Sequence, residues 1–257
     1  HLLSDLKRDD FPSYRAYLFP NLFQLTPERV DLIREKVMRD GAVAIFGPGT
    51  GIIHEGNRSA AGVSDLLGIP MELVEKEVAR RVLVHAGAHP ALEGVRQPIV
   101  YGDSYIYGPI LQPAFDLSGS DAIELGKAVT YFHGNTAGLV LREWGRGTRG
   151  RDPDSPRGMG DCAVVFSMAT PIPAAVLRSL ALYGGVVPWS DLGDVVAANE
   201  RMVAVHSMRG GKRTIRLPDQ ATARNALTGE VIGEDTDRLT VTLDAPATLI
   251  ILLEPSE

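Results

Sequence analysis

A glycine-rich loop and the polar pair that follows it carry the groups best suited to chemistry. The loop reads GPGTG at positions 47–51, directly after an apolar run, and His54-Glu55 follows it. At the carboxyl end of a strand in an open α/β sheet, such a loop lies where ligands bind. The candidate ligand-binding residues are Gly49, Thr50, Gly51, His54 and Glu55. The alternative is a tight turn in which these groups bind the chain's own backbone.

The common nucleotide and nucleophile motifs are not matched. A dinucleotide fingerprint needs glycine at the sixth place of G-x-G-x-x-G, where this chain has Ile52. The nearest approaches to a nucleophile elbow, at 62–66 and 160–164, both lack the final glycine. Cys162 opens an apolar run, which predicts a buried and inert thiol. We therefore expect no catalytic residue in this chain.

Metal and glycosidase patterns are equally weak. The six histidines form no H-x-H or H-E-x-x-H pair and there is one cysteine, so we expect no metal site and no cofactor. Asn199-Glu200 is similar to the Asn-Glu of many retaining glycosidases, in which the glutamate is the general acid. Here the pair lies among short alternating strands, which argues against a catalytic role.

The loop belongs to a segment, Tyr14 to Gly51, that predicts a strand, a helix and a second strand. Thr26 is a suitable N-cap and Pro27 fits the first helical position. Apolar residues then recur at helical spacing until Gly41, which we expect to end the helix. The continuous apolar run 42–46 is typical of a strand buried on both faces of a parallel sheet. Such a βαβ unit predicts a doubly wound α/β fold.

The rest of the chain continues this pattern and then changes. We expect a helix over 59–67 and another that Thr170 caps and Gly184-Gly185 ends, strands near 80–85, 138–144 and 162–168, and a mobile loop over 145–161. From about residue 186, short alternating strands at 202–206, 213–217, 238–243 and 248–253 indicate an antiparallel sandwich. The expected domains are 1–188, α/β, and 189–257, a small β domain.

Composition excludes several classes of protein. The formal net charge of −6 argues against a nucleic-acid-binding surface. No apolar run is long enough to cross a membrane, and the first residues lack the pattern of a signal peptide. A cytoplasmic protein is the simplest expectation, with secretion of a parent protein left open.

Several segments resemble the trimerisation-type domain of glycoside hydrolases of the family 42 β-galactosidase kind. They are residues 5–33, GAVAIFGPGTG (41–51), VSDLLGI (63–69), AHPAL (88–92) and PAFDL (113–117). GDVVAANERMVAVHS (193–207) and 212–232 are similar to the small β domain that follows it. The resemblance implies a flavodoxin-like parallel sheet of the class I amidotransferase kind without its catalytic residues. It also implies that the catalytic carboxylates belong to an upstream (β/α)8 barrel.

The start of the chain is unusual under this resemblance. Residues His1 to Leu6 read as the tail of a strand, and family members have a strand and a helix before this point. We therefore expect a piece cut inside its α/β domain, with a gap in the sheet that another polypeptide fills.

Two hypotheses follow. The first is a non-catalytic assembly region of a carbohydrate-active enzyme, whose partners are the upstream barrel, further copies of itself and the parent's carbohydrate substrate. The second is an autonomous amidotransferase-like or esterase-like hydrolase that uses Thr50, His54 and Glu55. A sugar-binding module or a regulator remains a further alternative. Glycosidase activity in the separated chain would contradict the first hypothesis.

Overall fold

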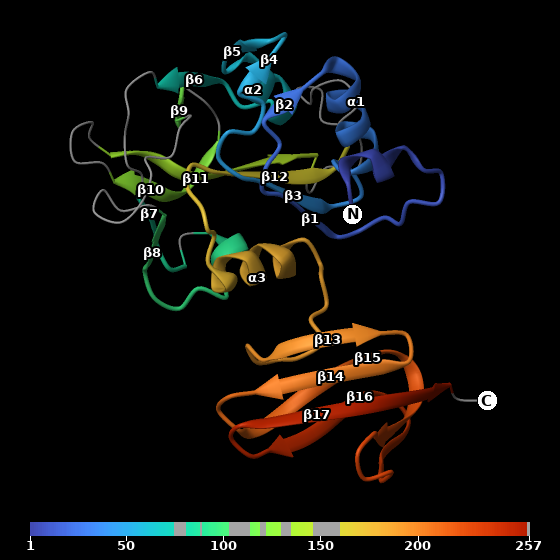
Figure 1. Ribbon diagram of the computed structural model, residues 1–257. Helices are drawn as coiled ribbons and strands as arrows, with labels where there is room; N and C mark the ends of the chain where they lie inside the picture. The colour runs from blue at the N-terminus through green and yellow to red at the C-terminus, as the bar shows by residue number, and fades with distance from the viewer. Residues whose placement is uncertain are drawn as a thin grey trace. The chain divides into compact units, whose positions relative to one another are not determined.

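The structure is a computed structural model that describes residues 1–74, 81–87, 89–102, 114–118, 122–129, 135–145 and 160–255 (Figure 1). The chain divides into two compact units, His1–Val186 and Val187–Glu257. Most of the loop expected at 145–161 lies outside the described residues.

The amino-terminal unit holds a seven-stranded sheet, two smaller sheets and short helices. In chain order its elements are η1 (Leu3–Lys7), β1 (Ala16–Phe19), β2 (Gln24–Leu25), α1 (Pro27–Lys36), β3 (Ala42–Phe46), β4 (Ile53–His54), β5 (Asn57–Arg58), α2 (Ala61–Leu67), β6 (Met71–Val74), β7 (Arg81–Val84), η2 (Pro90–Leu92), β8 (Ile99–Gly102), β9 (Ala114–Leu117), β10 (Ile123–Val129), β11 (Asn135–Trp144), β12 (Cys162–Ser167) and α3 (Ala174–Tyr183).

The predicted βαβ unit is confirmed. β1 and β3 pair in parallel, in a register that sets Ala16 opposite Val43, and α1 connects them. Thr26 caps α1 by accepting a hydrogen bond from the Arg29 N–H, and Pro27 is its first residue. The helix stops at Lys36, earlier than expected, and Gly41 instead makes the left-handed turn into β3.

The prediction of a flavodoxin-like, amidotransferase-like parallel sheet is wrong. The seven-stranded sheet has the order β1-β3-β12-β11-β10-β7-β8, and only β1, β3 and β12 pair in parallel. The other four strands are antiparallel to their neighbours. The described residues form three α-helices, so strands dominate and most are joined without a crossover helix. A doubly wound fold needs a helix after nearly every strand.

Close strand approach explains why the antiparallel half of the sheet curls into a half-barrel. A Cβ at Gly138 would lie 2.5 Å from the Ala128 nitrogen, and one at Gly126 would lie 2.8 Å from the Leu83 oxygen. The β10–β11 register also shifts on both sides of Gly126. Glycines and bulges of this kind let a sheet bend sharply, and a curled sheet encloses its own core with few helices.

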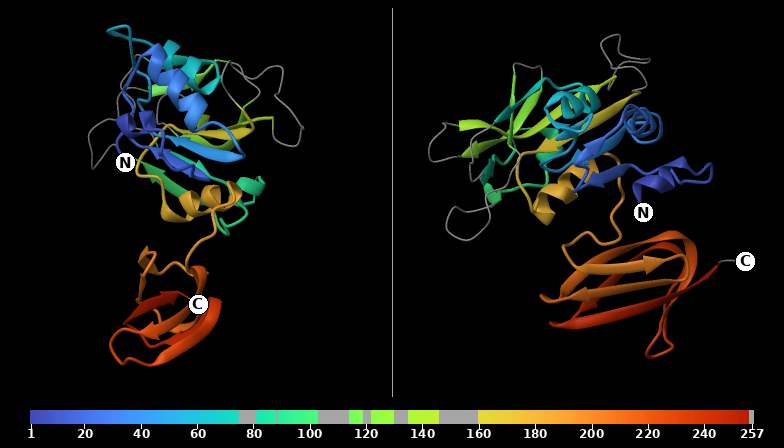
Figure 2. Two further views of the ribbon diagram at one scale, coloured as in Figure 1. Left: turned by 90° about the vertical axis from the view of Figure 1, so that its right-hand side faces the viewer. Right: turned by 45° about the horizontal axis from the view of Figure 1, so that its top comes forward.

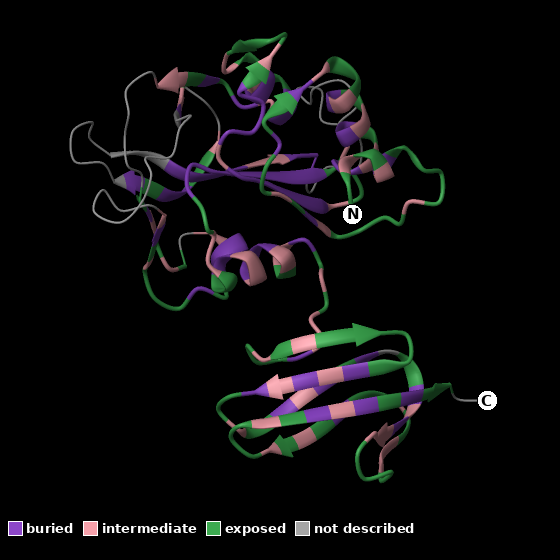
Figure 3. Ribbon diagram, viewed as in Figure 1, coloured by how far each residue is buried: buried purple, intermediate pink, exposed green. Residues whose placement is uncertain are grey.

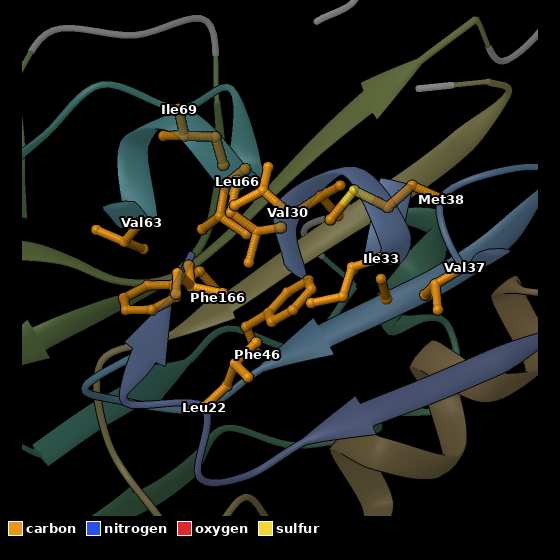
Figure 4. Close-up of a cluster of buried hydrophobic side chains, with 14 of the residues drawn as sticks. Leu22, Val30, Ile33, Val37, Met38, Phe46, Val63, Leu66, Ile69 and Phe166 are labelled. Atoms are coloured by element: carbon orange, nitrogen blue, oxygen red, sulfur yellow. The ribbon is translucent and has the colours of Figure 1, made fainter. Parts of the chain in front are cut away.

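Two hydrophobic cores lie on the two faces of β3, whose residues are all buried. Ala44 and Phe46 face the first core, which α1 and α2 cover with residues such as Ile33 and Leu66 (Figure 4). Val43 and Ile45 face the second core, which α3 covers with residues including Val176. Figure 2 shows these helices on opposite sides of the sheet. The predicted continuous burial of this strand is confirmed.

The helix predictions at 59–67 and before Gly184 are also confirmed, with one change. α2 ends at Gly68, whose φ is +65°, and the α3 N-cap is Pro173, not the expected Thr170. The expected strand tail at the start of the chain is wrong. Leu3–Lys7 is a 3-10 helix because the Asp5 carboxylate accepts a hydrogen bond from the Leu2 N–H at 2.7 Å.

The carboxy-terminal unit is antiparallel throughout, but it is one curled sheet and not a sandwich. Its strands are β13 (Val195–Asn199), β14 (Met202–Ser207), β15 (Gly211–Asn225), β16 (Val231–Leu243) and β17 (Ala247–Pro255), in the order β13-β14-β17-β15-β16. β15 bends at register shifts between Arg216 and Arg224. Buried and more exposed residues alternate along β14 and β17 (Figure 3). One face of the bent sheet therefore wraps a core of its own.

Crossing a membrane would need a longer and more apolar helix than any that the described part of the chain contains.

Candidate functional site

The glycine-rich loop leaves β3 at the carboxyl end of the three parallel strands, where the sequence predicts it. The Gly47 N–H donates to the Phe19 oxygen at 3.0 Å, which extends the β1–β3 ladder into the loop. A Cβ at position 47 would lie 2.7 Å from the Pro20 oxygen, so glycine is required by this close approach. The first residue of the loop is therefore part of the sheet edge.

Thr50 turns its polar group into the protein. Its side chain is fully buried, and its hydroxyl donates a hydrogen bond of 2.8 Å to the Gly47 oxygen. The Thr50 N–H lies 3.4 Å from the same oxygen. The hydroxyl therefore closes the turn, and nucleophilic chemistry would need this bond to break first.

Gly51 and Gly62 bring the loop against the start of α2. The Gly51 N–H donates to the Leu22 oxygen at 2.8 Å. A Cβ on Gly51 would lie 2.6 Å from the Val63 nitrogen, and one on Gly62 would lie 2.7 Å from the Gly51 oxygen. Two backbone segments thus touch where a ligand would need space.

His54 and Glu55 lie on a small hairpin beyond the loop. His54 pairs with Leu25 on β2 and with Asn57 on β5, and its ring Nδ1 is buried with no hydrogen-bond partner. Glu55 and Gly56 have φ values of 49° and 80°, which is the two-residue turn typical of a tight hairpin. The Glu55 carboxylate is therefore exposed, whereas the unpaired His54 nitrogen faces inward near Gly62.

The five predicted residues are neighbours in the chain, but their environments differ. Gly49, Thr50 and Gly51 form a packed turn, His54 is half-buried and Glu55 is exposed. Four cavities of about 330 to 560 Å³ are lined by described residues elsewhere, and none of these four includes a residue of this segment. Of the five side chains, His54 contributes the buried polar atom without a hydrogen-bond partner, Nδ1.

Asn199 ends β13, and Glu200 begins the two-residue turn that leads to β14. The Asn199 side-chain oxygen accepts hydrogen bonds from the Arg201 and Met202 N–H groups, both at 2.9 Å. Glu200 helps to line a cavity of about 330 Å³ with Asp219 and Glu254. The pair therefore lies in the all-β unit, as expected, and its asparagine shapes a turn.

Cys162 is fully buried at the start of β12, as the sequence predicts. Position 64, the serine of the other incomplete elbow, lies within α2, and its hydroxyl accepts a hydrogen bond from the Met71 N–H. Among the described residues, no group of three His, Cys, Asp or Glu side chains is placed to hold a metal ion.

A buried polar cluster in the carboxy-terminal unit was missed by sequence reasoning. Arg213 is 1% exposed, and its guanidinium donates to Asp194 Oδ2 at 2.7 Å, to the Gly211 oxygen at 2.5 Å and to the Ser207 hydroxyl. Burial alone would raise the pKa of Asp194, but the hydrogen bonds from Arg213, Ser190 and Ser207 outweigh it and lower that pKa. The sequence offered a signal for the burial of Arg213. Alternate residues of a strand lie on the same face, and Arg213 is two positions before the buried residue Ile215.

An apolar groove of about 460 Å³ lies along β1 and was also missed. The segment before β1 contributes residues such as Leu6, Phe11 and Tyr14, and β1 itself contributes Leu18. Phe11, Tyr14 and Tyr17 form successive edge-to-face ring contacts with centroids 5.7 to 5.8 Å apart. The spacing of these aromatic residues, three positions apart, is the feature of the sequence that could have indicated the groove.

No family model and no curated protein matches this chain. Among solved structures, Gan42B, a GH42 β-galactosidase, is similar over 94% of this chain and 32% of its own, with a TM-score of 0.52 at 15% identity. The cold-adapted β-galactosidase from Rahnella sp. R3 is similar over 93% of this chain and 32% of its own, with a TM-score of 0.51 at 14% identity. This chain therefore shares the fold of part of these two proteins and spans about a third of their length.

Proposed function

We propose that this chain is a non-catalytic assembly region, of the trimerisation type, in a carbohydrate-active glycoside hydrolase related to the β-galactosidases. One observation carries the proposal. The fold likeness covers 94% of this chain, and therefore both of its units, but only 32% of the galactosidase Gan42B. Both units of this chain match, and they follow one another in the same order. Chance explains such a match less easily than it would explain a match of a single common fold.

The chemistry of the candidate site supports a structural role. The Thr50 hydroxyl closes its own turn, and the carboxylates of Glu55 and Glu200 stand in exposed hairpin turns. A glycoside hydrolase needs two carboxylates on either side of the scissile bond, about 5 to 10 Å apart. We therefore place the catalytic carboxylates in an upstream barrel outside this chain. This placement agrees with a structural role for Thr50, Glu55 and Glu200.

The proposal names the partners. The chain would join the upstream catalytic barrel to further copies of itself, and the carbohydrate substrate would belong to the barrel. Most soluble oligomers are symmetric assemblies of identical subunits, so association with identical copies is the form of assembly that we expect.

The test combines an activity assay with a measurement of size. The purified chain is incubated with nitrophenyl β-galactoside and with a nitrophenyl ester, and its mass in solution is measured by sedimentation velocity. We expect no turnover above buffer, together with self-association. Turnover that is abolished by Thr50→Val or Glu200→Gln would overturn the proposal, and a strictly monomeric chain would contradict its assembly part.

A further inference from the structure

His206 and Met208 place an imidazole nitrogen beside a thioether sulfur in the carboxy-terminal unit. The His206 Nε2 atom lies 3.3 Å from the Met208 Sδ atom. His206 is the last residue but one of β14, and Met208 follows the strand directly. Ser207, between them, is buried, whereas Met208 is 70% exposed, so the in-and-out alternation of the strand continues to the methionine. Local backbone geometry therefore brings the two groups together at the surface.

Thr248 orients the imidazole ring from the neighbouring strand. It is the register partner of His206 on β17, and its hydroxyl oxygen lies 2.8 Å from His206 Nδ1. When Nδ1 carries the ring proton and donates it to this hydroxyl, Nε2 keeps a free lone pair on the side where the Met208 sulfur lies. Histidine ligands of metals are held in this way, by a hydrogen bond from the ring nitrogen that does not bind the metal.

The separation of the two atoms fits a shared metal ion. Bonds from a metal to imidazole nitrogen and to sulfur are about 2.0 and about 2.3 Å long. Two such bonds whose outer atoms are 3.3 Å apart meet at the metal at an angle of about 100°. This angle leaves the other side of the ion open to a further ligand. Both residues line a cavity of about 560 Å³, which has room for the ion and that ligand.

The donor atoms and the charges around them select the kind of ion. Thioether sulfur is a soft, neutral ligand that suits copper(I), whereas magnesium and calcium ions take oxygen ligands. The charged residues that line the cavity are Arg209, Arg213 and Asp194, and Arg213 holds the Asp194 carboxylate at 2.7 Å. The lining therefore carries one more positive than negative group, so it repels a divalent ion more strongly than a monovalent one.

We propose that His206 and Met208 bind a soft monovalent metal ion such as copper(I), with Thr248 as the positioning residue. The histidine and cysteine patterns of the sequence do not predict this site, because one of its ligands is a methionine. Every residue of the site belongs to the unit Val187–Glu257. The proposal goes beyond the assembly role and does not depend on it.

The experiment uses silver(I), which has the charge and the softness of copper(I) and is stable in air. The untagged chain, isotopically labelled at the methionine methyl groups, is titrated with silver nitrate in a buffer without chloride, and NMR follows the methyl signals. We expect the Met208 signal to shift until it saturates. The signal of Met202, a 37% exposed residue at the other end of β14, should stay in place. Equal shifts of both signals would show unspecific binding to exposed thioethers and would overturn the proposal.

Matched variants test the role of the methionine, with the ring signals of His206 as the measure of binding. Met208→Leu should raise the dissociation constant for silver(I) at least about tenfold, since even the loss of an outer-shell partner typically costs that much. Met202→Leu should leave the constant unchanged. If Met208→Leu binds as tightly as the unaltered chain, the metal site does not exist.

Thr248 is tested by a pair of substitutions. Thr248→Val removes the hydroxyl but keeps the shape of the side chain, and it should raise the dissociation constant about tenfold. Thr248→Ser keeps the hydroxyl and should bind as the unaltered chain does. Equal affinities in these two variants would show that Thr248 does not position the ring.

Zinc nitrate provides the test of ion selectivity. Zinc is bound in proteins by thiolate, imidazole and carboxylate groups, and the thioether is none of these. We therefore expect zinc to leave the Met208 methyl signal in place at concentrations at which silver(I) saturates it. An equal shift with zinc would contradict the preference for a soft monovalent ion.

Discussion

Arg213 and Asp194 form an ion pair inside the carboxy-terminal unit, with the guanidinium Nε 2.7 Å from the carboxylate Oδ2 and side chains that are 1% and 6% exposed. The pair joins β15 to the segment that precedes β13. The Ser190 hydroxyl also donates to Asp194, at 3.0 Å. The carboxylate thus has several donors, which a buried charge requires.

Asp194→Asn should destabilise the carboxy-terminal unit strongly, because it leaves the Arg213 charge buried and unpaired. We expect a loss of about 3 to 5 kcal/mol in the free energy of unfolding, measured by urea denaturation. The control is Glu254→Gln, which removes an exposed ion pair with Arg224 and should cost less than about 1 kcal/mol. Equal losses in the two variants would contradict the structural role of the buried pair.

The stability of the same unit should fall in acid. The folded pKa of Asp194 is below its ordinary value, so its contribution is present above about pH 4 and is lost as the pH falls through the folded pKa. Thermal unfolding followed between about pH 2 and pH 7 should show this loss. In Asp194→Asn, the melting temperature should fall less between neutral and acid pH than in the unaltered chain. An equal fall in both would show that Asp194 is not the group responsible.

Gly51→Ala separates backbone strain from steric overlap when it is compared with Gly56→Ala. Both glycines have positive φ, at 68° and 80°. A Cβ at Gly56 meets nothing within 4 Å, so its cost should be about 1 to 2 kcal/mol of strain. At Gly51 the clash with α2 adds to that strain, and we expect about 2 to 5 kcal/mol in chemical denaturation. Similar costs at both positions would contradict the close contact between the loop and α2.

Thr50→Val tests whether the loop hydroxyl is structural. The variant keeps the shape of the side chain but leaves the Gly47 oxygen with the long contact to the Thr50 N–H, so we expect a loss of about 1 to 3 kcal/mol. Glu55→Gln, in the exposed turn nearby, should change stability by less than about 0.5 kcal/mol. Calorimetric melting of the two variants measures the difference, and a fully stable Thr50→Val would show that the hydroxyl does not close the turn.

Some helices and strands were predicted correctly from sequence signals that lie within the element itself. Thr26, Pro27 and the apolar run 42–46 predicted the cap, the start of α1 and the buried strand β3. The alternation around Ile215 predicted a half-buried strand. Each signal depends on φ preference, side-chain hydrogen bonding or periodicity within a few residues, so no distant contact was needed to detect it.

The flavodoxin-like prediction failed at strand pairing. β10 and β11 follow segments without helical periodicity, and each pairs antiparallel with its neighbours. The close contacts at Gly126 and Gly138 belong to this arrangement, and they involve residues from three different strands. A glycine in the sequence indicates that its backbone can adopt unusual conformations. It does not indicate which other strand will lie against it.

The sequence by itself determined the βαβ unit, the place of the glycine-rich loop after β3 and the change to antiparallel strands in the last part of the chain, although β15 and β16 are longer than the short strands it predicted. Only the tertiary structure decided that the sheet is mixed and curled, that Thr50 faces inward and that β1 is an edge with an apolar groove. The physical reason is that element type follows from local backbone preferences and periodicity. Strand order, burial of a hydroxyl and exposure of an edge depend on which distant segments meet.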